Sequence, residues 1–386
     1  MGKLRKVLGR GRIYVNASAP QGGNGRSWQS ACRDLAEAMH LAPPWTEIWI
    51  AGGTYKPDRG TRDQEAKFTF KEGFRLLGGF KGGESTADQR DVAKNPTILS
   101  GVIDPDGDPE KSSHHVVAVG WTVRHGLLDG VIIEGGNSER FGGGLMINGS
   151  GAGGITVRDC IVRRNSAYAA GGVFCLKSGA IFERCRFEQN TAVVRAGGFY
   201  VLSGLPKLIK CEFVGNVSAE GGSALYNIQG DPAIEDCRFV ENSCEDEGAA
   251  VLSISGRPVF SGCLFERNRS GFGGAYFHDS GFGTIRNCRF VGNEAARDGG
   301  GLFVKNGFPE VENCIFEANR AQRGGAIFSL RGRFSPTNCR FGENHAQQGS
   351  AIHTEEVARV ELKGCQISQD AGVVSGSGLV ALGSGR

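Results

Sequence analysis

Nine cysteines recur along this sequence at a nearly constant step. Every interval between neighbouring members is 25 or 26 residues. Such a register indicates a fold that returns to the same place once per repeat. The nine members are Cys160, Cys185, Cys211, Cys237, Cys263, Cys288, Cys314, Cys339 and Cys365.

Two other positions keep the same step. A large apolar residue stands two places after each cysteine, and asparagine stands five places after each of the first eight. A glycine pair such as Gly300-Gly301 usually follows, and then a short apolar run. The apolar residues are Val162, Phe187, Phe213, Phe239, Phe265, Phe290, Phe316, Phe341 and Ile367, and the asparagines are Asn165, Asn190, Asn216, Asn242, Asn268, Asn293, Asn319 and Asn344.

One repeat shows what these positions require. Residues 314–316 alternate between two faces, as a strand does. Asn319 stands where the chain must bend, and asparagine tolerates the left-handed conformation that bends require. Val311 lies three residues before Cys314, which strict alternation would put on the opposite face, so we expect another bend at 313–314. Each repeat then holds three short strands and three bends, with no helical stretch.

A parallel β-helix satisfies this pattern, in which each repeat forms one coil. We expect an all-β, single-stranded parallel β-helix of about 12 coils. Like residues then stack at roughly 4.8 Å, so the asparagine amides form a hydrogen-bonded ladder and the phenylalanines an internal stack. Leucine-rich repeats need a leucine framework that this chain lacks, and propeller blades need about 40 residues each.

The same geometry predicts that the cysteines are reduced. Stacked Cβ atoms lie near 4.8 Å apart, beyond the roughly 3.5–4.5 Å of a disulfide. We therefore expect small, buried, apolar thiols along the ladder. Cys32, Cys175 and Cys244 lie off the ladder, and the sequence gives them no partner. Zinc is not expected, because no CxxC or closely spaced Cys/His cluster occurs.

Composition excludes several classes of protein. The 386 residues carry 44 basic and 41 acidic side chains, a net charge of +3, which gives no argument for a nucleic-acid partner. No run of about 20 apolar residues occurs, so we expect no membrane span. Residues 1–6 are basic without an apolar segment after them, which is not a signal peptide. The sequence leaves open a cytoplasmic protein or one whose leader is missing.

We expect three regions in one continuous domain. Residues 1–46 hold an N-terminal strand and a capping helix over 27–41, with Ser27 as N-cap. Residues 47–130 form irregular early coils, and residues 131–386 form the regular ones. After Cys365 no helix caps the end, so the last strands fold over it or the C-terminal end self-associates.

The repeats resemble those of chlamydial polymorphic outer membrane proteins. The matching motif is FxxN, which occurs at Phe187, Phe213, Phe239, Phe265, Phe290, Phe316 and Phe341 with the asparagine three residues later. The N-terminal third is similar to right-handed parallel β-helix repeat proteins of the pectin-lyase-like superfamily. Its matching stretches are residues 13–16 (IYVN), 25–28 (GRSW), 47–57 (EIWIAGGTYKP) and 95–101 (NPTILSG).

The resemblance implies a right-handed fold and an extracellular or cell-surface location. It implies no activity, since this group is mostly secreted or surface proteins without assigned chemistry. The chain departs from the group in lacking a signal sequence, a C-terminal sorting domain and an autotransporter barrel, which puts surface display in question.

One candidate binding site is a row of arginines beside the cysteine ladder. Between ladder cysteine and phenylalanine, every second coil carries arginine, and stacking would place these side chains roughly 9–10 Å apart on one strand face. Such a row fits the carboxylates or sulfates of an acidic polysaccharide. The alternative is a solvated row with glutamates such as Glu188 and Glu317 as ion partners. The row is Arg186, Arg238, Arg289 and Arg340.

A second candidate is a calcium loop. Asp104, Asp106 and Asp108 alternate around Gly107, and hard carboxylate oxygens suit calcium. Pro105 and Pro109 are unusual in such a loop, so a solvated loop between coils is the alternative. Apart from this possible calcium, we expect no cofactor.

The other charged residues indicate surface ion pairs and not a catalytic site. At the bend after the asparagines stand Arg195, Glu220, Glu247, Asp298 and Arg323, whose mixed signs suggest surface pairs. A polysaccharide lyase needs a base near calcium carboxylates, and a glycosidase needs two carboxylates about 5–10 Å apart. Asp279 beside His278 and Glu355 beside His353 are the nearest acidic groups, and neither forms a clear pair.

Three functions remain open. The leading hypothesis is a non-catalytic surface or secreted β-helix for adhesion, with glycan or surface-protein contacts on its strand faces. The first alternative is a carbohydrate-active enzyme, a lyase or hydrolase of acidic polysaccharide. The second is a scaffold that assembles end to end through its C-terminal coil.

Overall fold

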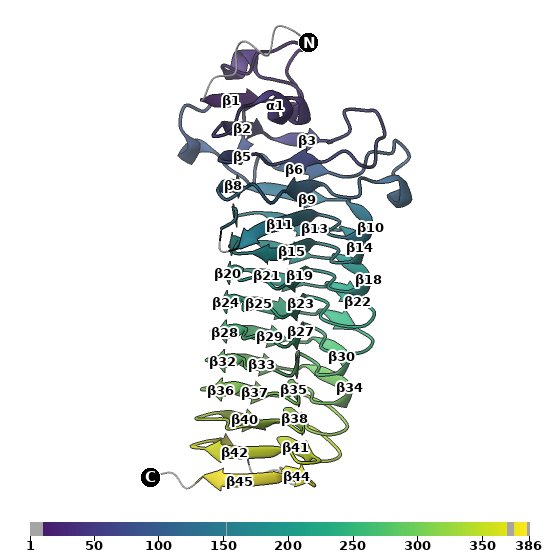
Figure 1. The fold of residues 1–386 in the computed structure, drawn as a ribbon, viewed down its shortest axis with the longest axis vertical. Coiled ribbons are helices and arrows are strands. Elements are labelled where there is room, and N and C mark those ends of the chain that lie inside the picture. Colours follow the sequence, from purple (N-terminus) through teal and green to yellow (C-terminus); the bar gives the residue numbers. More distant parts are fainter. Residues whose placement is uncertain (1–10, 152, 369–373, 384–386) are drawn as a thin grey trace. The chain divides into compact units, whose positions relative to one another are not determined.

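The computed structural model describes residues 11–151, 153–368 and 374–383. It divides into two compact units, Met1–Asn190 and Thr191–Arg386, and each is described by itself. In both units the paired strands run parallel, so each unit is a β-solenoid (Figure 1). Val373 and the residues after Gly383, which belong to the expected C-terminal end, lie outside the described residues. The expected boundaries at 46 and 130 stay a prediction.

The strands of the N-terminal unit form four sheets, named A to D, and a regular coil visits them in the order A, B, D, C. Sheet A holds β1 (Arg12–Val15), β2 (Glu47–Ala51), β5 (Phe74–Phe80), β8 (Gly126–Asp129), β12 (Thr156–Arg158) and β16 (Ile181–Glu183). Sheet B holds β3 (Gly53–Tyr55), β6 (Thr97–Ser100), β9 (Val131–Glu134), β13 (Ile161–Arg163) and β17 (Arg186–Glu188). Sheet D, visited before sheet C, holds β10 (Asn137–Phe141) and β14 (Ser166–Ala169), and sheet C holds β4 (Phe68–Thr69), β7 (Val117–Val119), β11 (Leu145–Gly151) and β15 (Val173–Ser178).

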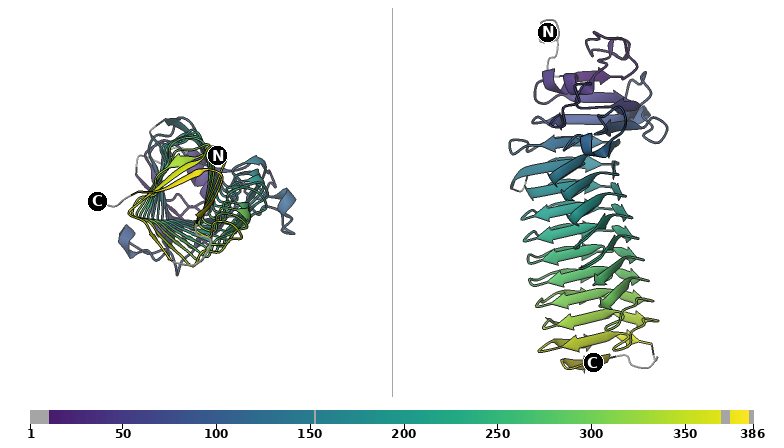
Figure 2. Two further views of the ribbon diagram at one scale, coloured as in Figure 1. Left: turned by 90° about the horizontal axis from the view of Figure 1, so that it is seen from below. Right: turned by 90° about the vertical axis from the view of Figure 1, so that its right-hand side faces the viewer.

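The C-terminal unit repeats this plan with greater regularity, and its coils overlie one another when seen end-on (Figure 2). Sheet A holds β20 (Lys207–Ile209), β24 (Ala233–Glu235), β28 (Val259–Ser261), β32 (Thr284–Arg286) and β36 (Glu310–Glu312), and is followed by β39 (Arg333–Phe334), β42 (Arg359–Lys363) and β45 (Leu379–Gly383). Sheet B holds β21 (Glu212–Val214), β25 (Arg238–Val240), β29 (Leu264–Glu266), β33 (Arg289–Val291), β37 (Ile315–Glu317), β40 (Arg340–Gly342) and β43 (Gln366–Ile367).

The other two sheets of the C-terminal unit lie on the return path of each coil. Sheet D holds β18 (Thr191–Arg195), β22 (Val217–Ser218), β26 (Ser243–Cys244), β30 (Arg269–Phe272) and β34 (Glu294–Asp298). Sheet C holds β19 (Phe199–Leu202), β23 (Leu225–Ile228), β27 (Val251–Ile254), β31 (Tyr276–Asp279), β35 (Leu302–Lys305), β38 (Ile327–Leu330), β41 (Ile352–Glu355) and β44 (Val374–Gly376). Sheet D is therefore a fourth sheet beside the three that the repeat predicts.

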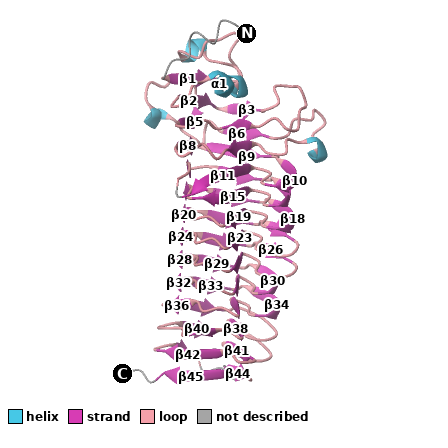
Figure 3. Cartoon of the chain, in the orientation of Figure 1, coloured by secondary structure: helices cyan, strands magenta, loops and turns pink. Residues whose placement is uncertain are grey.

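The described helices are short and belong to the N-terminal unit (Figure 3). They are the 3-10 helices η2 (Trp28–Ser30), η3 (Ala87–Gln89) and η4 (Pro109–Lys111) and the α-helix α1 (Leu35–Leu41). The continuous helix expected over 27–41 is wrong, because Cys32 is extended and bridges Val15. Asp34 then caps α1 by accepting a hydrogen bond from the Glu37 amide (2.8 Å).

The asparagine ladder is confirmed, and its role differs from the expected one. The Asn268 side chain donates to the carbonyl of Phe239 (2.9 Å) and to the Asn293 side chain (2.9 Å). The left-handed residue at this bend is not the asparagine but its predecessor, for example Arg267 with φ 52°. Asparagine is therefore selected because its buried amide bonds the backbone across the bend and the next coil, not because of its own dihedral angles.

The phenylalanine stack and the second bend are also confirmed. The rings of Phe239 and Phe265 lie 4.8 Å apart and within 5° of parallel, and those of Phe265 and Phe290 lie 4.6 Å apart. Asn313, at the expected bend before a ladder cysteine, has φ 51°. Each internal ring therefore contacts the ring of the next coil, which places every outward residue in a defined column.

All twelve cysteines are free thiols, and all except the half-buried Cys365 are buried. The ladder thiols do more than fill space, since seven of them lie within reach of a carbonyl of the preceding coil. Cys237 Sγ is 3.4 Å from the carbonyl oxygen of Leu208, and Cys185 Sγ is 3.3 Å from that of Val157. A thiol is a weak donor, so the ladder satisfies carbonyls at the bend between sheets A and B.

Replacing Asn268 tests the ladder. Asn268→Ala leaves the Phe239 carbonyl without its donor and the Asn242 side chain without its acceptor. Because each orphaned buried group costs about 1–3 kcal/mol, urea denaturation should show a loss of about 3 kcal/mol. The control is Gln322→Ala, which removes an exposed amide and should change stability by less than about 0.5 kcal/mol. Equal effects of the two changes would contradict the ladder's role.

Thiol titration tests the reduced interior. Burial raises the pKa of Cys160 and of Cys175 to about 12, so these groups stay protonated near neutrality. A chromogenic disulfide reagent should therefore react with at most Cys365 in the native protein and with all twelve thiols after denaturation. Fewer than twelve after denaturation without reductant would indicate disulfides instead.

Candidate functional site

The predicted arginine row lies where the repeat places it, on the outward face of sheet B. In the C-terminal unit Arg238 and Arg289 flank Leu264 in register. Arg238 pairs with Glu212 (3.2 Å) and Arg289 with Glu317 (3.8 Å). In the N-terminal unit Arg186 pairs with Glu188 (2.5 Å).

The fourth member of the row differs, because Arg340 forms no ion pair with any residue that the structure describes. Two of the three members in the C-terminal unit are thus neutralised by carboxylates from neighbouring coils. A ligand-binding role for the row stays a prediction.

In the acidic loop, carboxylates accept hydrogen bonds from the loop's own backbone amides. Asp104 is buried, and its Oδ2 accepts from the amides of Asp106 (3.0 Å) and Asp108 (3.3 Å). Asp108 in turn caps η4 and pairs with Lys111 (3.1 Å). In the described part of the chain no three His, Cys, Asp or Glu side chains converge as metal ligands would. The calcium site stays a prediction.

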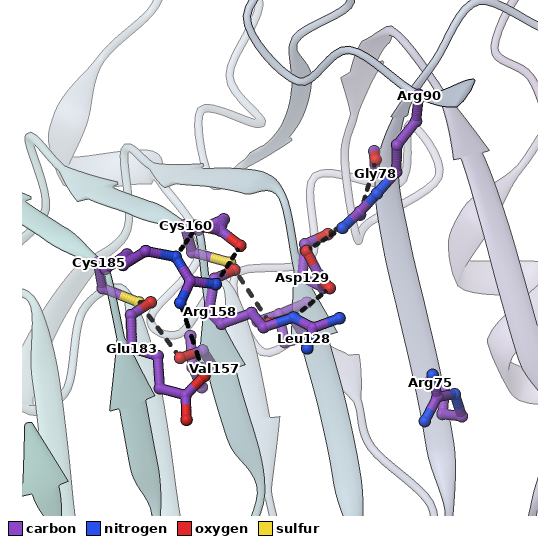
Figure 4. A network of polar contacts seen from close by, with 12 residues as sticks. Arg75, Gly78, Arg90, Leu128, Asp129, Val157, Arg158, Cys160, Glu183 and Cys185 are labelled. Carbon is purple, nitrogen blue, oxygen red and sulfur yellow. Dashed lines mark hydrogen bonds and ion pairs between the residues drawn. The ribbon is translucent and has the colours of Figure 1, made fainter. Parts of the chain in front are cut away.

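A buried ion triad in the N-terminal unit is structural. Both oxygens of the buried Asp129 are occupied, one by Arg90 (2.5 Å) and the other by Arg158 (2.6 Å) (Figure 4). Arg90 also donates to the carbonyl of Gly78 (3.2 Å). The triad ties the segment after η3 to sheet A, and its carboxylate is out of reach of a substrate because the Asp129 side chain is 0% exposed.

A cavity of about 690 Å³ lies between α1 and the end of β3. Its acidic side chains, Asp34 and Glu37, both pair with Arg59 (3.3 and 3.1 Å). Arg33 and Lys56 also line it. The cavity is therefore lined by charges of both signs, and its two carboxylates share one arginine.

The C-terminal unit carries a second row of stacked side chains that the repeat did not predict. On sheet C, Tyr226, Phe277, Phe303 and Phe328 point away from the solenoid interior but are buried. Phe277 and Phe303 stack at 4.5 Å, and Phe272 of sheet D lies edge-on to Phe303 at 5.9 Å. Sheet D therefore covers part of the outer side of sheet C, and this cover explains why both faces of these strands are apolar.

Eight charged side chains lie along this covered row, and we call them the polar strip. Five come from the ends of sheet D and the bends after it, and three from the ends of sheet C strands. Guanidinium and ammonium groups lie over the rings, with Arg323 5.0 Å from the Phe328 centroid and Lys305 5.8 Å from that of Phe277. The strip comprises Arg195, Glu220, Glu247, Asp298, Arg323, Asp279, Lys305 and Glu355.

The centre of the polar strip brings two carboxylates to one lysine. Lys305 Nζ lies 3.5 Å from Asp279 Oδ2 and 4.0 Å from Glu247 Oε1. Because both distances start at the same nitrogen, the two carboxylate oxygens lie no more than about 7.5 Å apart. The side chains of Glu247 and Asp279 are 33% and 21% exposed, so a ligand can reach both.

The two flanks of the strip are also paired. Arg323 binds Asp298 through two hydrogen bonds (2.7 and 2.8 Å), contacts Glu355, and so bridges the ends of sheets D and C. At the other flank Arg195 pairs with Glu220 (2.8 Å) and donates to the Tyr226 hydroxyl (2.9 Å). These pairs confirm the expected ion pairs at the bend.

Burial raises the pKa of Glu247 above its usual range. Lys305 opposes the shift, Asp246 and Asp279 add to it, and Arg195 opposes it. Perturbed carboxyl groups beside a second carboxylate are typical of sites that handle protons. Each of these charged residues was visible in the sequence, but their proximity could not be predicted. Glu247 and Asp279 come close together only because sheet D folds back over sheet C.

Comparison with known proteins places the fold and not the activity. Residues 171–341 match the family described as the right handed beta helix region. No curated protein matches the sequence. The narrower likeness to chlamydial outer membrane repeats stays a prediction.

Three solved structures are similar over most of this chain. Pectate lyase Pel9A is 12% identical with a TM-score of 0.31, over 97% of this chain and 78% of its own. The Geobacillus virus E2 protein ORF18 is 14% identical with a TM-score of 0.41, over 95% and 62%. The GH136 lacto-N-biosidase of Eubacterium ramulus is 8% identical with a TM-score of 0.35, over 96% and 68%.

Replacing Glu247 tests its electrostatic environment. A raised folded-state pKa means that the folded protein holds the proton longer than the unfolded chain, so stability is lost as pH rises from the usual glutamate value of about 4.3 through the folded value. Glu247→Gln should therefore match the parent in acid and become more stable than it towards neutrality, as measured by urea denaturation across pH. A control, Glu241→Gln, removes an exposed partner of Arg267 and should show no such gain. Parallel pH curves for parent and Glu247→Gln would contradict the shift.

Proposed function

We propose that the C-terminal unit binds a linear glycan along the polar strip. The observation that carries this proposal is the arrangement of half-buried, paired charges on successive coils over a covered aromatic row. Adjacent coils repeat at roughly 4.8 Å, so the strip is a regular series of polar groups and suits a polymer with a regular polar repeat.

The chemistry of the strip supports sugar hydroxyls as its ligands. A carboxylate has about four acceptor sites, so Asp279 and Glu355 keep free lone pairs after pairing with Lys305 and Arg323. Hydroxyl groups donate and accept, and can join such a network without leaving a charge unpaired. The partial exposure of Glu355 (33%) and Lys305 (32%) leaves these atoms within reach.

A position outside the cell forms part of the same proposal. It rests on the resemblance to surface and secreted β-helix repeat proteins and on the ligand class that the strip favours. No helix in the described ranges is long and apolar enough to cross a membrane.

A second candidate function is hydrolysis of the bound glycan, favoured by Glu247 and Asp279. Their separation of no more than about 7.5 Å includes the distances that retaining and inverting glycosidases use. The raised pKa of Glu247 suits a general acid, which protonates the leaving oxygen as the glycosidic bond breaks. Asp279 would then serve as the nucleophile or as the base that activates water.

Binding to a panel of immobilised neutral and acidic polysaccharides tests both functions. The parent should retain at least one glycan, and Glu355→Gln should weaken that binding about tenfold, because a charged hydrogen-bonding group is lost. The matched control Glu241→Gln also removes a carboxylate paired to arginine but lies away from the strip, and should bind like the parent. Equal losses in both variants, or no retention of any glycan, would contradict binding at the strip.

The same panel separates binding from hydrolysis. New reducing ends that appear with the parent and not with Glu247→Gln, while binding persists, would establish hydrolysis. Binding without new reducing ends leaves a non-catalytic protein, the leading expectation from the sequence.

A further inference from the structure

A row of exposed side chains borders the polar strip where each coil passes from sheet C to sheet A. From the second member onward, each amide donates to a carbonyl of the preceding coil, as from Phe308 to Gly281 (3.0 Å) and from Arg333 to Gly307 (3.1 Å). The amide of the first member, Arg257, donates instead to the side-chain carboxylate of Asp231 (2.6 Å). The members are thereby fixed one above another. We call Arg257, Phe282, Phe308, Arg333 and Arg359 the corner row.

The centre of the corner row is an exposed aromatic pair. Phe282 is 58% exposed and Phe308 is 44% exposed. Their rings stack with centroids 5.5 Å apart and planes within 23°. The pair is not part of the core, and it presents a flat apolar surface of two adjacent rings to solvent.

The ends of the corner row are cationic, and their guanidinium groups have no carboxylate partner among the described residues. Arg257, Arg333 and Arg359 are exposed and form no ion pair within the described ranges. Arg333 and Arg359 face each other on neighbouring strands β39 and β42. Like charges at facing positions of neighbouring strands destabilise a sheet, so fold stability does not account for this pair.

The charges of the two surfaces differ in sign. The polar strip has five carboxylates and three cations, whereas the charged members of the corner row are all arginine. Phe282 and Phe308 each stand three residues after a strip residue, Asp279 and Lys305, so at most about 11 Å of chain separates them. A ligand on the strip therefore reaches the corner row.

We propose that the corner row binds an anionic pyranose unit of the glycan held on the strip. The apolar C–H face of the sugar lies on Phe282 and Phe308, and its carboxylate or sulfate lies against Arg333 and Arg359 or against Arg257. This assignment rests on the proposed glycan binding and adds to it the class of sugar. It also moves the anion-binding site from sheet B, where Arg238 and Arg289 are already neutralised, to the turn after sheet C.

Calorimetry with four defined probes tests the assignment. An oligogalacturonate hexamer supplies carboxylates, a chondroitin sulfate hexasaccharide supplies sulfates, cellohexaose is a neutral sugar, and hexaglutamate is an anion without sugar rings. The parent should bind at least one anionic hexasaccharide about tenfold or more tightly than cellohexaose or hexaglutamate. The preferred hexasaccharide identifies the anionic group.

Two double variants and a matched control locate the site. Phe282→Ser with Phe308→Ser, and Arg333→Gln with Arg359→Gln, should each weaken binding of the anionic hexasaccharide about tenfold or more. Arg238→Gln with Arg289→Gln removes two arginines from sheet B and should leave binding of the anionic hexasaccharide unchanged. All these side chains are exposed, and unchanged melting curves should show that every variant folds.

The outcomes separate the two proposals. If neither anionic hexasaccharide binds, if hexaglutamate binds as tightly, or if the sheet B variant loses as much affinity as the other two, the corner row assignment is wrong. If the parent nevertheless binds neutral glycans and Glu355→Gln weakens that binding, glycan binding along the polar strip would still be supported. If Glu355→Gln leaves all binding intact while the corner row variants abolish it, the strip proposal fails instead.

Discussion

The hydrogen-bonded register between coils is the constraint on which the rest of the structure depends. An asparagine within the ladder bonds the backbone of one neighbouring coil and the side chain of another, as Asn268 does with Phe239 and Asn293. A shift of one residue would turn every side chain to the opposite face. Because the register is fixed, residues at the same position of successive repeats lie one above another and form a straight column on the surface.

Columns explain why charged residues far apart in the sequence act together. Glu247, Asp279 and Lys305 come from three successive coils. Asp279 and Lys305 are partners in the pairing of β31 with β35, whereas Glu247 bridges Phe272 of sheet D. Sheet D closes the arrangement by covering the outer aromatic row and bringing Glu247 to Lys305. The same covering withdraws water from Glu247 and shifts its pKa upward.

The internal features could be predicted from the sequence because each is a property of one repeat. The cysteine step and the large apolar residue two places later are visible in all nine of these coils, and the asparagine five places later in the first eight. The dihedral role assigned to asparagine was wrong, since a sequence shows which residue stands at a bend but not which one is left-handed. Arg267 and Ala318 take that conformation.

The outer features could not be predicted in the same way. Tyr226 and Phe277 stand next to internal residues, so their burial depends on a fourth sheet that the repeat pattern does not reveal. The five bend charges and the acidic residues Asp279 and Glu355 were each visible, but their distances depend on how sheet D folds back. The arginine row was found where expected, and its neutralisation by Glu212 and Glu317 depends on pairing between coils.

Hydroxyl-radical footprinting most directly tests the claim that the outer side of sheet C and its following turn form the binding face. Phe282 and Phe308 are exposed in the free protein and should be oxidised readily, as should Val193 and Val217 of sheet D. On saturation with the anionic hexasaccharide, oxidation of Phe282 and Phe308 should fall while that of Val193 and Val217 stays the same. Unchanged oxidation of the two phenylalanines in the bound state would contradict the account.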